Sequence, residues 1–137
     1  MADDEGGAGG AGDAALEAAL TAREAEVDAL LRGGRPSDAL KRALQDPPFA
    51  SKNAALKDRN AALVSRALVA AGAKEEVLAA FLASVDADSA DAMMKYVVRL
   101  LGVFSPHTPL FLKTHALLVE KCGLGCLVRC IVDRRVA

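Results

Sequence analysis

The stretch LQDPPFASKNAALKDRNAAL, residues 44–63, holds two adjacent prolines with a helix-like pattern on either side. The residue before a proline resists the α conformation, so the preceding helix is predicted to end near Gln45. Beyond the prolines, Ser51 is predicted to cap a long helix. Composition is similar on both sides, and similar breaks recur along the chain. Pro47-Pro48 is therefore interpreted as the corner of a helical hairpin, and not as a linker between domains.

The same apolar pattern at helical intervals fills most of the chain, and no sustained alternation indicates strands. We therefore predict an all-α fold of about seven helices. Their short connections favour antiparallel neighbours, which either stack into a right-handed curl or close into a bundle. The predicted helices cover residues 14–32, 36–45, 51–71, 77–85, 86–101, 110–121 and 124–134.

Residues 1–13, MADDEGGAGGAGD, are Gly-rich and acidic. Such a segment cannot offset its ordering entropy by burial, so we expect a mobile, disordered acidic tail followed by a single helical domain over residues 14–137. The acidic start also differs from a basic and then apolar secretory signal. The longest uncharged run, residues 100–112, contains two prolines and would not span a membrane. An intracellular protein is expected.

The overall composition argues against several classes of partner. The 137 residues are 26% charged with a net charge of -1, which gives no general attraction to nucleic acid or anionic membranes. The dilute basic stretch, interpreted as a solvated face, lacks the interleaved aromatics of nucleic-acid binders. Its members are Lys52, Lys57, Arg59 and Arg66. No serine-hydrolase, zinc-protease or phosphate-loop motif occurs, so neither an enzyme nor a small-molecule substrate is predicted.

Three cysteines and a histidine near the C-terminus are of the residue types that bind zinc. Cys122, Cys126 and Cys130 would share one helical face, with His115 one heptad upstream. However, a Cys-x-x-Cys knuckle is missing and two glycines interrupt the helix. Because cysteine also packs as a small hydrophobe, core packing is the preferred interpretation, and no metal or other cofactor is predicted.

Candidate partner-facing residues lie in the last third of the chain. Met94 and Tyr96 belong to an apolar run that reads first as core and second as an exposed binding stripe. Arg129 and Arg134 suit the end of the last helix and are the other interface candidates. The helix at residues 93–101 and the C-terminal helix are the candidate locations of an exposed apolar surface.

Several blocks of the sequence, in order and at comparable spacing, resemble subunit 5, the smallest subunit, of the actin-related protein 2/3 complex. Lys57-Asp58-Arg59 matches a block that opens a long helix after a double proline in that family. Met94-Lys95-Tyr96 matches a second block. The resembling segments are EVDALLRGG, ALKRALQDPP, SKNAALKDRNAALV, MMKYVVRLL and GLGCLVRCIVDRRV, within residues 26–136.

The resemblance implies an α-α superhelix of solenoid type without enzymatic activity, in the cytoplasm and cytoskeleton. It implies a role in nucleating branched actin filaments by bridging the propeller subunit and subunit 4, with the N-terminal tail reaching actin-related protein 2. The alternative is a free tetratricopeptide-like adaptor that binds peptides, because residues 31–48 carry part of that repeat's rhythm. A period of about 34 residues would support it, and the sequence holds no second copy.

Overall fold

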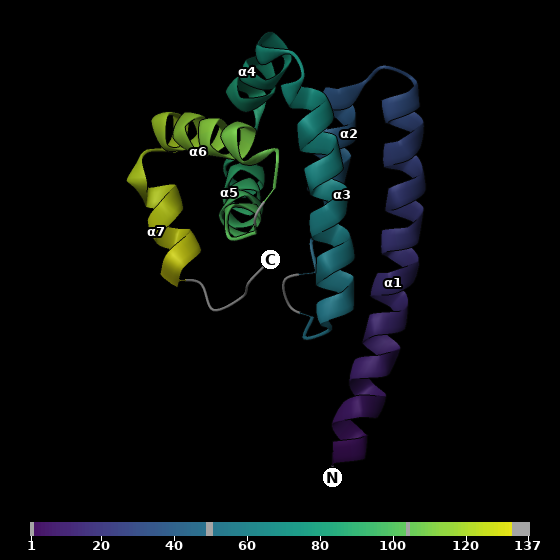
Figure 1. Ribbon diagram of the computed structural model, residues 1–137. Helices are drawn as coiled ribbons and strands as arrows, with labels where there is room; N and C mark the ends of the chain where they lie inside the picture. Colours follow the sequence, from purple (N-terminus) through teal and green to yellow (C-terminus); the bar gives the residue numbers. More distant parts are fainter. Residues whose placement is uncertain (1, 49–50, 104, 133–137) are drawn as a thin grey trace.

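The computed structural model describes residues 2–48, 51–103 and 105–132. Within these ranges the chain forms seven α-helices and no strand, which confirms the all-α prediction (Figure 1). No helix of this described part is long and apolar enough to cross a lipid bilayer. The helices are α1 (Ala2–Arg32), α2 (Pro36–Ala43), α3 (Ala54–Gly72), α4 (Glu75–Ser84), α5 (Ala87–Leu101), α6 (Thr108–Cys122) and α7 (Leu124–Val132).

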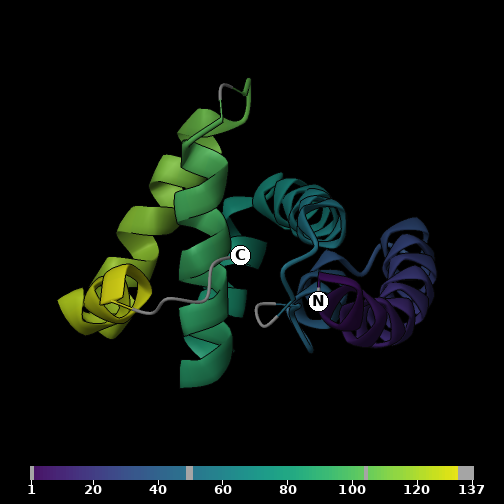
Figure 2. The same ribbon diagram turned by 90° about the horizontal axis from the view of Figure 1, so that it is seen from below.

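Helices that follow one another in the sequence also pack together, as in a solenoid. Helix α2 packs on both α1 and α3, while α6 packs on both α5 and α7. Helix α4 contacts α3 and α6, and so joins the two groups. Figures 1 and 2 show α1 to α3 on one side of the molecule and α5 to α7 on the other. The superhelical arrangement is thus formed by two helical layers around a shared core.

Helix α3 supplies the centre of that core because its apolar residues recur every three or four positions. Leu63, Val64 and Leu68 are buried, and the alanines between them let neighbouring helices approach closely. From the other side, Met93 and Phe111 meet the same cluster. A single continuous core therefore joins the two halves of the chain.

The double-proline corner, described at residues 44–48 and 51–53, connects two helices that pack on each other, which confirms the hairpin interpretation. Helix α2 ends at Ala43, and Asp46 takes a left-handed conformation with φ 48°. The prediction that Ser51 caps the next helix is wrong by two positions in the sequence. The side chain of Asn53, not Ser51, accepts the first free N–H groups of α3. Ser51 instead accepts from the Asn53 N–H at 3.0 Å and supports the cap.

Helix α1 begins at Ala2 and not at Ala14, although the segment GGAGGAG is rich in glycine, a poor helix former; no proline interrupts it. Asp13, the last residue of the predicted tail, accepts hydrogen bonds from Ser51 at 3.0 Å and from Asn53 at 3.3 Å. The helical boundary therefore differs from the prediction. The mobility of residues 1–13 and the domain boundary at Ala14 stay predictions.

Two of the basic residues interpreted as a solvated face are partly exposed and also join α3 to α1. Arg59 pairs with Glu24 at 3.1 Å, and Arg66 pairs with Asp28 at 3.0 Å. Sequence spacing does not reveal such pairs because their members lie far apart in the chain. Exposed ion pairs contribute little stability each, about 0–1 kcal/mol, but they fix how α1 lies along α3.

The glycine pair after α1 gives a test of the backbone. Gly34 has φ +72°, whereas Gly33 has no positive φ and space for a side chain. We expect Gly34→Ala to destabilise the fold by about 1–2 kcal/mol because a Cβ disfavours the left-handed region. Gly33→Ala, the matched control, should be neutral or stabilising by up to about 1 kcal/mol. Urea unfolding measures both, and equal effects would contradict the assigned backbone.

Candidate partner interface

Helix α7 presents an apolar stripe to solvent. Leu124, Val128 and Ile131, which we call the α7 stripe, are 67%, 54% and 73% exposed. Their spacing places them on one side of the helix, while Leu127 and Cys130 pack against the core from the other. Figure 1 shows α7 at the edge of the molecule, beyond α5 and α6. The helix is apolar around most of its circumference, so one side lacks a partner within the described chain.

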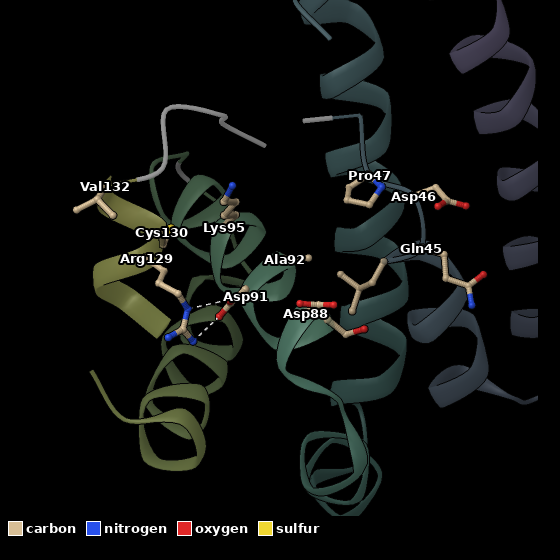
Figure 3. A pocket seen from close by; sticks show the side chains of 12 residues that line it. Gln45, Asp46, Pro47, Asp88, Asp91, Ala92, Lys95, Arg129, Cys130 and Val132 are labelled. Carbon is tan, nitrogen blue, oxygen red and sulfur yellow. Dashed lines mark hydrogen bonds and ion pairs between the residues drawn. The ribbon is translucent and has the colours of Figure 1, made fainter. Parts of the chain in front are cut away.

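An ion pair fixes the orientation of α7. The Arg129 guanidinium donates two hydrogen bonds to the Asp91 carboxylate, at 2.8 and 2.9 Å (Figure 3). Asp91 lies on α5, so this fork-to-fork contact joins the two helices at a defined rotation. Together with the packing of α7 on α5 and α6, this contact places the α7 stripe on a docked helix.

A pocket of about 590 Å³ lies between α5, α7 and the double-proline corner. Gln45, Asp46 and Pro47 form the corner wall, which faces the α5 and α7 residues across the space in Figure 3. Asp88 and Ala92 lie on the α5 wall. Most of the exposed lining area is apolar, and charged residues such as Asp88 and Lys95 lie among it.

A buried polar cluster connects α1, α3 and α5 behind this pocket. Arg23 on α1 donates to the Asn60 side chain at 2.9 Å, and Asn60 donates to the hydroxyl of Tyr96. Arg23 and Tyr96 are 3% and 1% exposed. Arg23 also donates to the backbone carbonyls of Gln45 and Asp46. The cluster positions three helices and the corner through directional bonds.

Burial perturbs two members of this cluster. It raises the pKa of Tyr96 to about 12, against smaller opposing effects from the Asn60 hydrogen bond and the Arg23 charge. Burial also lowers the pKa of Arg23, mainly through desolvation, although an arginine stays charged in proteins. The tyrosine is thus kept neutral, in keeping with a packing role.

Tyr96 offers a direct optical test because it is the single tyrosine and tryptophan is absent. In the folded chain, tyrosinate absorbance should rise with a midpoint near 12, compared with about 10 in denaturant. Because the folded pKa exceeds the unfolded one, its stability contribution is complete below about pH 10 and lost as pH rises through about 12. A folded-state midpoint near 10 would contradict its burial.

The interface candidates from the sequence lie in different environments. Met94 and Tyr96 are in the core, with 0% and 1% exposed, which favours the core interpretation over the exposed stripe. They are covered because α5 packs between α3 on one side and α6 and α7 on the other. Arg129 is exposed at the surface of α7 while pairing with Asp91. Arg134 lies outside the described residues.

The zinc-type residues show packing rather than a ligand cluster. Cys122 and Cys130 are half-buried against the hydrophobic core. Among the side chains that the structure describes, no three His, Cys, Asp or Glu residues gather closely enough to hold a metal ion. The side chain of Cys126 lies outside that description.

Sequence reasoning missed the Arg23 cluster, although a signal was present. Arg23 falls between Leu20 and Val27 on the apolar face of α1, where a charge is unexpected. Asn60 likewise falls between Leu56 and the later apolar positions of α3. Polar residues at core positions of two helices are a pattern typical of a buried hydrogen bond between them.

A helical body with an apolar stripe that no described residue covers is typical of a protein-interaction module. The family model described as "ARP2/3 complex 16 kDa subunit (p16-Arc)" matches residues 10–137. The chain belongs to this family of actin-related protein 2/3 complex subunits.

Curated relatives from this family align with most of the chain. Subunit 5 from Dictyostelium discoideum is 36% identical over 131 residues, covering 96% of this chain and 93% of the relative. Subunit 5A from Arabidopsis thaliana is 32% identical, covering 87% and 88%. Subunit 5-B from Xenopus laevis is 32% identical, covering 82% and 73%. The family resemblance inferred from the sequence is confirmed.

Proposed function

We propose that this chain is a non-catalytic structural subunit that contributes to the nucleation of branched actin filaments by bridging other subunits of the complex. Family membership supports a place in the actin-related protein 2/3 complex. The exposed α7 stripe is the observation that supports the bridging role. A permanent subunit retains apolar surface that a free monomer would bury. The chain would act in the cytoplasm and cytoskeleton as part of that assembly.

The proposed partners are the propeller subunit and subunit 4 for the helical body, and actin-related protein 2 for the N-terminal segment. The separation of the two surfaces supports a bridge, because α7 and the start of α1 lie far apart in both ribbon views (Figures 1 and 2). Arg129, at the surface of α7, is proposed to lie at the edge of the contact, and Arg134 remains an interface candidate from its sequence position.

Branch formation by complexes with and without this chain tests the role. The other subunits are assembled with the wild-type chain or without it, and branches per filament length are counted by fluorescence microscopy. We expect the complex without the chain to form fewer branches, and added chain to restore them. Equal branching in all three samples would contradict the proposal and favour a free adaptor. Assembly of each sample is checked by size-exclusion chromatography, so that a loss of branching is not confused with disintegration.

A further inference from the structure

Two successive backbone carbonyls at the double-proline corner converge on one buried guanidinium. The Nη1 group of Arg23 donates to the carbonyl oxygens of Gln45 and Asp46, the latter at 2.8 Å. Asp46 is in the left-handed region, with φ 48°, which aspartate adopts more readily than most residues with a side chain. The corner therefore has a left-handed turn whose carbonyl groups accept hydrogen bonds from a residue of α1.

The environment of Arg23 argues against a role in stability alone. Its hydrogen-bond acceptors are neutral, namely the two carbonyls and the Asn60 amide oxygen. Its Nε atom is buried without a hydrogen-bond partner in the described structure. A buried charge with neutral acceptors and an unsatisfied donor is costly to desolvate. The burial of Arg23 is better explained by the backbone conformation that it selects at the corner.

The backbone conformation that Arg23 fixes at the corner forms one wall of the pocket. Gln45, Asp46 and Pro47 line the pocket opposite α5 and α7 (Figure 3), whereas Arg23 is absent from the lining. Arg23 thus holds this wall from behind.

Helix α1 has fewer fully buried apolar side chains than α3 within the described part of the chain. Those of α1 are Leu20 and Val27, while Leu16, Leu30 and Leu31 are partly buried against the core, and several other contacts are exposed ion pairs. Helix α3, by comparison, buries a continuous apolar face. Elements with few buried apolar contacts open first in native proteins.

We propose that Arg23 is a positioning residue that couples the docking of α1 to the shape of the pocket between the double-proline corner, α5 and α7. When α1 is docked, the corner carbonyls are hydrogen-bonded to Arg23 and the corner wall keeps its described position. When α1 separates, the corner loses its donor and relaxes. A partner that binds α1 would in this way alter a surface next to α7 without contacting it.

Native-state hydrogen exchange of the unmodified full-length chain is the first test. The N–H of Leu44 donates to Leu40, and that of Gln45 donates to Arg42. We expect both amides to exchange through the same opening as the amides at residues 20–27 of α1, with the same dependence on low denaturant. Residues 63–68 of α3 should require a larger opening. Corner amides that exchange independently of α1 would overturn the coupling.

Substitution gives a second, local test. In Arg23→Met, which keeps a long side chain but removes the donors, exchange at Leu44 and Gln45 should accelerate about tenfold or more. The matched control is Arg66→Met, which removes an exposed contact between α3 and α1 and should leave the corner unchanged. A uniform acceleration across all helices would indicate general destabilisation and overturn the proposal, as would an unchanged corner. If Arg23→Met does not fold, the measurement on the unmodified chain still decides.

Discussion

Ile131→Asp on α7 is expected to prevent stable association with the complex while leaving the fold of the isolated chain intact. Ile131 is 73% exposed and lies in the α7 stripe. In the free chain an aspartate there stays hydrated, so stability should change by no more than about 0.5 kcal/mol. Buried beneath a partner, the same carboxylate would be unpaired. The loss of binding free energy should exceed about 2 kcal/mol, which is a rise of roughly 30-fold in Kd.

The control introduces the same charge on an exposed alanine of a different helix, Ala62→Asp on α3. Both variants are compared by thermal unfolding and by capture of the partner subunits on the tagged chain. Normal capture by Ile131→Asp would show that the α7 stripe is not the contact surface. A loss of capture by both variants would show that any added charge disrupts assembly.

Phe111→Ala is expected to destabilise the chain by about 3–5 kcal/mol, because it removes a large ring from the close-packed core. Phe111 is 1% exposed on α6 and belongs to the cluster that joins the two groups of helices. This is a large share of the total stability of an ordinary domain. The midpoint of urea unfolding, followed by circular dichroism, measures the loss.

Leu112→Ala is its neighbouring control, because Leu112 is 56% exposed. It should change stability by no more than about 0.5 kcal/mol. If the two substitutions had equal effects, the rotation of α6 on the core would be wrong. If Phe111→Ala produced two separate unfolding transitions, the halves would not share one continuous core.

The helices could be predicted because their signals are local. The double proline ends one helix, Gly34 takes the positive φ that a stop needs, and Asp86 caps α5 as its position indicated. The start of α6 differed by a small shift, since Pro109 fits in the first turn of a helix. Each of these features depends on a few neighbouring residues, which one sequence contains in full.

The contacts between helices could not be predicted in the same way. The Arg23 to Asn60 bond joins residues far apart in the chain, and the Arg59 and Arg66 pairs depend on how α1 lies along α3. Periodicity shows that a helix has an apolar face but not which neighbour covers it. For α5 the face is covered, and Met94 is buried, whereas for α7 the stripe is left exposed. That difference decides which helix offers a surface to a partner.

Capture of the tagged full-length chain from cells at moderate salt, followed by size-exclusion chromatography and protein identification, tests the central claim most directly. The account predicts co-elution with both actin-related proteins and the propeller subunit in equal stoichiometry. Elution of the folded chain alone, or with unrelated proteins, would contradict the role of a bridging subunit.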